Sequence, residues 1–183
     1  MDDSDRVDAT SGLPVVRLAG VFFLAVVVFG AGTFVTELAG EIPPDIDAKP
    51  FGLVYLLLAL VPFGAATLAI SLGAAVGEGF LDVREGIEPD DPFGFLGYVV
   101  GFVAFAWLLH RVAPSPDDRR WQLLAAAVGA WTQALFEALG FLVMGDGDAT
   151  MTALTVTGNT LTHGVLFGAI VLLVLYPTVA DHR

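Results

Sequence analysis

The stretch FGLVYLLLALVPFGAATLAISLGAAVGEGF, residues 51–80, decides how the chain is organised. As one helix these 30 residues would extend about 45 Å, whereas the hydrocarbon core of a bilayer is only ~30 Å thick. Pro62, Phe63 and Gly64 lie near its middle, and a proline removes a backbone donor and clashes with the preceding helical turn. We therefore expect a short helix over 51–61, a tight turn, and a second helix over 65–80.

Four further segments are apolar enough and long enough to cross a bilayer, which takes about 20 residues as a helix. The chain is 56% hydrophobic and 15% charged, whereas a soluble domain is about 25% charged. We predict an all-α integral membrane protein, multi-pass in the cell membrane, with residues 14–180 forming one six-helix transmembrane domain. Residues 1–13 are expected to be a disordered acidic tail. The four segments are 15–38, 93–112, 121–144 and 154–178.

Charge placement favours six helices over five. With six helices and the N-terminus inside, the cytoplasmic side carries six basic residues and the outside two, Lys49 and Arg84. With five helices, the better orientation places five basic residues inside and three outside. Cytoplasmic loops carry an excess of Lys and Arg, so we expect six helices, a short second one, and both termini inside. The six cytoplasmic residues are Arg6, Arg17, Arg111, Arg119, Arg120 and Arg183.

The overall charge excludes several classes of function. The chain carries 20 acidic and 8 basic residues, a net charge of -12, so it lacks the basic surface that nucleic acid requires. Seven of the basic residues are Arg, and acid-rich, Lys-poor loops indicate a salt-loving source of the halophilic archaeal type. Cys is absent, which excludes thiolate chemistry. The single lysine, Lys49, precedes Pro50, so there is no Walker A phosphate loop.

Polar residues inside the apolar segments predict a pocket. Gln133 and Glu137 lie one turn apart on the fifth helix, as do Asn159 and His163 on the sixth, and residues four apart share a helix face. An ionised group near the bilayer centre costs about 2.5–3.5 kcal/mol, so Glu137 needs an explanation. The fifth helix runs outward and the sixth inward, which places both polar stripes in the outer half of the membrane. We infer a polar pocket that opens outward, with Tyr98 on the same side.

Structural alternatives exist for each of these residues. Glu137 could instead hold helices together by hydrogen bonding to His163 or Asn159, and His163 could be a buried, satisfied histidine. Trp131 and Trp107 fit packing or interface positions. Glu37 and Glu78 lie near helix ends, where solvation makes a charge less costly. No carboxylate lies at a chelating spacing from His163, so no metal site is expected.

Small residues predict close helix packing. Ala65, Ala69, Gly73 and Gly77 recur at every fourth position of the third helix, and such ridges let helix backbones approach within lipid. We interpret this ridge as internal packing. The alternative is a contact surface for a partner subunit.

We do not expect an enzyme, and no cofactor is expected. Ser71 lacks the G-x-S-x-G setting of a hydrolase, and neither H-E-x-x-H nor paired intramembrane aspartates occur. The remaining catalytic alternative is an intramembrane hydrolase with a Ser71 and His163 dyad.

The segment IPPDIDAKPFGLVYLLLALVPFGAATLAISLGAAVGEGFLDVREG, residues 42–86, resembles the early region of the S components of energy-coupling factor (ECF) transporters. These small six-helix membrane proteins capture vitamins and related micronutrients. Pro62-Phe63-Gly64 stands where the family has a Gly-Pro-type turn between a short second helix and a third helix rich in small residues. The segment GNTLTHGVLFGAI, residues 158–170, is similar to the family's last helix.

This resemblance implies capture of a small micronutrient from outside, with a transmembrane coupling subunit and ATPase subunits as partners. It also implies substrate-binding residues, with Glu137 as charge partner, Gln133 and Asn159 as amide donors or acceptors, and Tyr98 or Trp131 as an apolar wall. The alternative is a non-transporting membrane scaffold or assembly protein. The residues implied to bind substrate are Tyr98, Gln133, Glu137, Asn159 and His163, with Asp45 and Asp47 in a lid-like loop.

Overall fold

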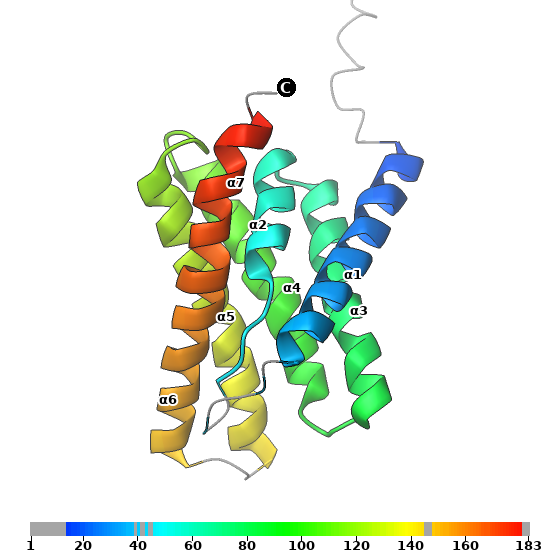
Figure 1. The fold of residues 1–183 in the computed structure, drawn as a ribbon, viewed down its shortest axis with the longest axis vertical. Coiled ribbons are helices and arrows are strands. Elements are labelled where there is room, and N and C mark those ends of the chain that lie inside the picture. The colour runs from blue at the N-terminus through cyan, green and yellow to red at the C-terminus, as the bar shows by residue number, and fades with distance from the viewer. Residues whose placement is uncertain (1–13, 39, 41–42, 44–45, 145–147, 181–183) are drawn as a thin grey trace, which may run out of the picture.

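The structure is a computed structural model, and it describes residues 14–38, 40, 43, 46–144 and 148–180. The expected tail over residues 1–13 and the predicted loop residue Asp45 lie outside the described residues. The described chain is a bundle of helices that run alternately in opposite directions (Figure 1). The helices are α1 (Val15–Glu37), α2 (Phe51–Leu60), α3 (Ala65–Glu85), α4 (Asp91–Trp107), α5 (Arg119–Met144), α6 (Ala149–Asn159) and α7 (Val171–Ala180).

Two π-helical stretches extend these helices. The π-helix η3 (Leu108–Val112) continues α4, and η4 (Thr160–Ile170) joins α6 to α7. As a result α6, η4 and α7 form one continuous helix, Ala149–Ala180. A π-helical turn holds an extra residue and is often found at functional sites. The sequence reading did not anticipate either stretch, because no local sequence pattern distinguishes a π-helical stretch from an α-helix.

The break expected near Pro62 is confirmed. Helix α2 ends at Leu60 and Val61 is extended, with φ -114° and ψ 151°. Gly64 adopts φ +155°, a conformation that side-chain-bearing residues rarely take, and its N–H donates to Thr67 Oγ1 at 3.1 Å. The turn therefore closes one helix and caps the next.

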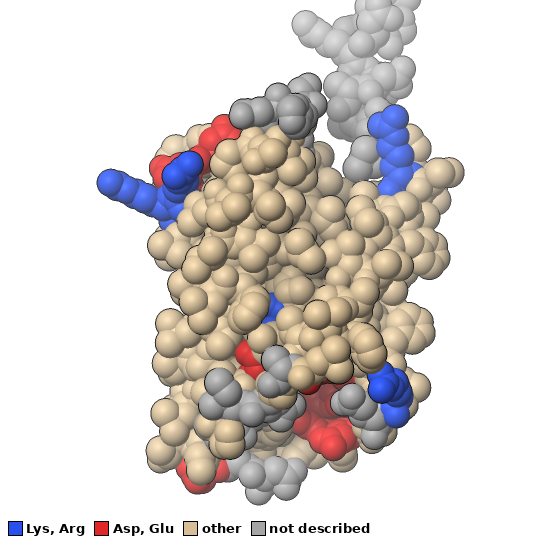
Figure 2. Space-filling view, in the orientation of Figure 1, with Lys and Arg blue, Asp and Glu red and all other residues tan. Residues whose placement is uncertain are grey.

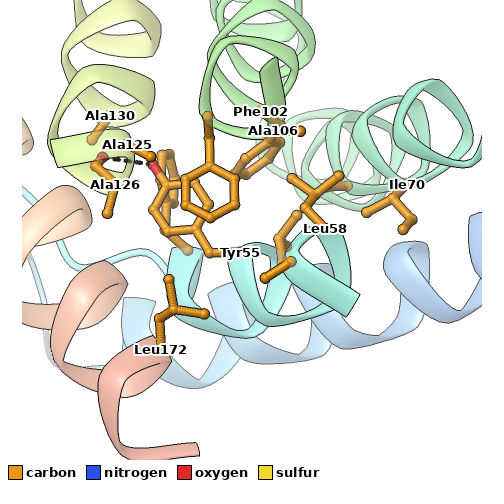
Figure 3. Packing of buried hydrophobic residues seen from close by; sticks show 14 of the residues in the cluster. Tyr55, Leu58, Ile70, Phe102, Ala106, Ala125, Ala126, Ala130 and Leu172 are labelled. Carbon is orange, nitrogen blue, oxygen red and sulfur yellow. Dashed lines mark hydrogen bonds between the residues drawn. The ribbon is translucent and has the colours of Figure 1, made fainter. Parts of the chain in front are cut away.

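Helix α2 lies at the centre of the bundle (Figure 1). The Tyr55 ring stacks on Phe105 of α4 with ring centroids 4.1 Å apart, and its hydroxyl donates to Ala126 O of α5 at 3.0 Å. Leu172 of α7 packs on the same cluster (Figure 3). The burial of this short helix on several sides explains why its sequence is apolar all round.

The ridge of small residues on α3 packs against α1. A Cβ added at Gly77 would lie 2.6 Å from Val26 O and 3.0 Å from Gly30 N, both backbone atoms of α1. An added Cβ at Gly73 would likewise meet Phe22 O of α1, so the interpretation as internal packing is confirmed for Gly73 and Gly77, whereas Ala65 is exposed. The Gly77 part of this ridge is not free to receive a partner subunit.

The outside of the bundle is apolar between two charged ends. Five helices are long and apolar enough to cross a membrane, and large side chains such as Phe23, Val27 and Val174 are about 64% exposed. In the face shown by Figure 2 most charged side chains gather near the two ends, with a broad uncharged band between them. Exposed apolar surface on this scale indicates contact with lipid. The structure thus supports a multi-pass helical membrane protein.

The close contact of α1 and α3 yields a test by glycine substitution. Gly77→Ala should lower the free energy of unfolding by about 1–3 kcal/mol, because its methyl group would collide with rigid backbone. Gly79→Ala is the matched control on the same helix, since nothing lies within 4 Å of its added Cβ and alanine favours helix by up to about 1 kcal/mol. Thermal unfolding in mild detergent measures both. Equal stability of the two variants would contradict this packing.

Candidate functional site

The connection between α1 and α2 enters the bundle. Helix α2 has only ten residues, about 15 Å of rise, and the described residues just before it, 47–50, are irregular chain. These residues are partly or fully buried. The side chains of Asp47 and Lys49 are only 20% and 12% exposed. This segment places two charged groups among the helices.

Lys49 joins the connection to α3 and α4. Its Nζ lies 3.0 Å from Asp47 Oδ2 and also pairs with Glu78 Oε1. The same Glu78 oxygen accepts a hydrogen bond from the Tyr98 hydroxyl at 3.2 Å. One ammonium group thus links the connection to two helices.

A second set of contacts joins the connection to α5, α6 and η4. His163 Nε2 lies 2.6 Å from Asp47 Oδ1, and the Asp47 N–H donates to Asn159 Oδ1 at 3.3 Å. Asn159 Nδ2 and Gln133 Nε2 both donate to Glu137 Oε2, at 3.5 and 3.2 Å. These residues, with Lys49, Glu78 and Tyr98, are called the polar network below.

The two charged connection residues are buried with partners. Asp47 pairs with Lys49 and His163, and Lys49 pairs with Asp47 and Glu78. A buried charge is costly unless it is paired and hydrogen-bonded, so these contacts explain how both side chains can lie among the helices.

The structure brings together all five residues that the sequence nominated. Tyr98, Gln133, Asn159 and His163 are at most 3% exposed, and each bonds within the network. The polar stripe of α5 meets the stripe at the junction of α6 and η4, because the i, i+4 spacing directs the two residues of each stripe to one side. Glu137 does bond to Asn159, so the two stripes also hold helices together.

Sequence reasoning did not identify Lys49 as part of the site, and it placed Glu78 at a solvated helix end. The charge tally treated Lys49 as an ordinary outside loop residue, whereas its side chain is buried in the network. Glu78 is only 4% exposed. One signal was available: Lys49 is the only lysine in a chain that otherwise uses Arg. The pairing itself joins positions 29 residues apart, which no local pattern reveals.

The network lies beside an acidic cavity. The cavity has a volume of about 580 Å³, and a smaller space of about 100 Å³ beside it is lined by Lys49, Glu78, Tyr98 and Glu137 among others. Eight carboxylate residues and one lysine line the larger space, called the acidic cavity below. Its lining residues are Thr36, Glu37, Gly40, Asp47, Ala48, Lys49, Glu78, Asp82, Gly86, Glu88, Asp90, Asp91, Glu137 and Phe141.

Three buried polar atoms of the network have no hydrogen-bond partner among the described residues: Glu78 Oε2, Gln133 Oε1 and His163 Nδ1. Buried polar atoms are nearly always paired, by protein, water or ligand. Leaving such an atom unpaired costs about 1–3 kcal/mol. These three atoms are enclosed by the protein and present almost no accessible surface.

Several other predicted roles do not fit this site. Trp131 and Trp107 are each 51% exposed, so Trp131 is not a wall of the cavity. Ser71 Oγ and His163 Nδ1 both lack a partner and His163 Nε2 bonds to Asp47, so Ser71 and His163 do not form a dyad. Among the described residues, no group of three His, Asp or Glu is arranged to hold a metal ion.

Comparison with known proteins gives no match to a family model, a curated protein or a solved structure.

The buried contacts of Asp47 predict a contribution to stability. Asp47→Asn should lower the free energy of unfolding at pH 7 by on the order of 3 kcal/mol, because it breaks a buried ion pair. Thermal unfolding in mild detergent measures the difference.

Asp118→Asn is the control, since Asp118 Oδ1 accepts from the Arg120 N–H and an asparagine can do the same. An Asp47→Asn variant as stable as wild type would argue against the ion pairs of Asp47.

Proposed function

We propose that this chain is a membrane-embedded substrate-capture subunit that binds a small micronutrient in the acidic cavity. The observation that carries the proposal is the cavity itself, which adjoins a buried network with unpaired polar atoms. Its volume of about 580 Å³ falls within the usual range for small-molecule sites, roughly 300–1,000 Å³. A purely structural polar cluster needs no such space.

Charge placement supports an outward-facing cavity. The described chain begins and ends at one end of the bundle (Figure 1). Arg17 lies near the start of α1, Arg111 at the end of η3, and Arg119 and Arg120 at the start of α5, all toward that same end. Because basic residues favour the cytoplasmic side, this end would lie inside and the acidic cavity outside. Six crossings, with α2 and the connection as the second, fit this orientation.

In an importer of the ECF type, other subunits would supply the ATPase activity for which this sequence shows no motif. The sequence has no phosphate-binding loop, so uptake against a gradient would need a transmembrane coupling subunit and ATPase subunits. The resemblance of residues 42–86 and 158–170 to ECF S components supports those partners. In this proposal Glu137 is a charge partner of the ligand, while Gln133 and Asn159 orient both Glu137 and the ligand.

A membrane scaffold is the second candidate. One observation favours it: Lys49 already pairs with Asp47 and Glu78, so part of the network is satisfied without any ligand. A scaffold would use these ion pairs to fix the connection in place. The two proposals differ in whether the cavity is occupied by a small molecule in the native protein.

Ligand capture predicts that a small molecule accompanies the protein. Mass spectrometry of extracts from protein purified in mild detergent and high salt should detect one, and its readdition should raise the melting temperature, since ligand binding stabilises the native state. Glu137→Ala should weaken its equilibrium binding at least tenfold. Trp131→Ala, on the exposed face of the same helix, should bind normally. A folded protein that retains and binds no small molecule would favour the scaffold.

The proposed orientation predicts the labelling of engineered cysteines. Because the chain has no Cys, Met144→Cys and Thr152→Cys each provide a unique thiol at the cavity end. Both should react with a membrane-impermeant maleimide in intact cells. Ser115→Cys, in the connection between η3 and α5, should react only after the membrane is opened. The reverse pattern would place the cavity on the cytoplasmic side and rule out capture from outside.

A further inference from the structure

We infer that residues 181–183, which follow α7, fold over a second cavity at the end of the bundle opposite the acidic cavity. In this arrangement Arg183 binds Asp117 and the last backbone carbonyl groups of α2. The inference goes beyond the proposed function and does not depend on a ligand in the acidic cavity.

The second cavity lies where α2 ends. It has a volume of about 480 Å³, and its wall is formed by the end of α2, η3, the connection between η3 and α5, and α7. The last four carbonyl groups of a helix have no partner within that helix. One of them, Leu58 O, accepts a hydrogen bond from His110 Nε2 at 2.9 Å. A nitrogen donor from a basic side chain is therefore already used at this helix end.

The charges in this wall complement a guanidinium group. The C-terminal end of a helix carries a partial negative charge, and α2 has no basic residue in its last turn. Asp117 adds a carboxylate, and neither Lys nor Arg lines the space. Both kinds of oxygen accept hydrogen bonds, and a guanidinium group presents five N–H donors in one plane. One arginine can therefore bond to Asp117 and to the end of α2 together.

The chain that follows α7 starts at the wall of this cavity. Ala180, the last residue of α7, lines it, as does Tyr176 one turn earlier, and residues four apart share a helix face. The Tyr176 hydroxyl also donates to Asp117 Oδ1 at 2.8 Å, which brings that carboxylate beside α7. Residues 181–183 are Asp-His-Arg, and three residues of extended chain reach up to about 10 Å. Arg183 is thus within reach of this space.

A covered second cavity limits access to α2. With residues 181–183 in place, the end of this central helix is closed off from the aqueous phase at that end of the bundle. A molecule or protein segment that approaches α2 from there must first displace these three residues. In the orientation proposed above, this is the cytoplasmic side, so the segment would close the bundle inside while the acidic cavity opens outside.

A single engineered thiol tests whether the segment covers the cavity. Val61 lines this space and the chain has no Cys, so Val61→Cys reports on it alone. Purified protein in mild detergent is treated with a maleimide at constant pH, with and without deletion of residues 181–183. The deletion should speed the reaction at least fivefold. Thr152→Cys, at the other end of the bundle, is the control and should react at the same rate in both chains.

Charge variants test how the segment is held. Arg183→Glu should speed the labelling of Val61→Cys as much as the deletion does, because its carboxylate would face Asp117 and the carbonyl oxygens of α2. Arg183→Lys keeps a cationic donor and should retain most of the protection. Asp181→Asn is the matched control in the same segment and should leave the rate unchanged. These variants decide the question if the shortened chain fails to fold.

Two results would overturn the inference. Equal labelling rates with and without residues 181–183 would mean that detergent, lipid or other side chains cover the cavity. Full protection in Arg183→Glu would mean that Arg183 does not hold the segment in place. Neither result bears on ligand capture in the acidic cavity, which is tested separately by co-purification.

Discussion

The structure depends on one constraint: α2 is too short to cross a bilayer. Its ten residues rise about 15 Å, roughly half of the ~30 Å hydrocarbon core. The described residues just before it, 47–50, are irregular backbone that passes among the helices. Lipid offers no hydrogen-bond partners, so such backbone is tolerated only where protein or a water-filled space surrounds it. Polar side chains on the surrounding helices follow from that requirement.

The polar network supplies hydrogen-bond partners to the connection between α1 and α2, and in doing so it buries charged side chains. The Asp47 N–H finds Asn159, and the Asp47 carboxylate lies between Lys49 and His163. Buried ion pairs add little net stability because desolvation opposes them, yet removing one partner is costly. The network is therefore better understood as fixing where the connection lies than as a source of stability. A site fixed in this manner can hold a ligand without rearranging first.

The sequence predicted the parts of the fold that have a local cause. Pro62 and Gly64 predicted the break between α2 and α3, and the length of the apolar segments predicted the long helices. The i, i+4 spacing of Gln133 and Glu137 predicted that both lie on one face of α5. Such patterns are read within a few turns of helix. The pairing of Lys49 with Glu78 depends on how α1, α2 and α3 fold back on one another, so no local pattern predicts it. The π-helical stretch around His163 was missed for a similar reason, since tertiary packing decides it.

The single lysine has a practical consequence. Acylating reagents that modify primary amines need access to the amine, and Lys49 is enclosed and paired with two carboxylates. In the closed bundle its side chain is shielded from such reagents, and trypsin has no accessible lysine among the described residues. Because no other lysine competes for the label, the rate of acylation at this one position reports how often the connection between α1 and α2 leaves the bundle.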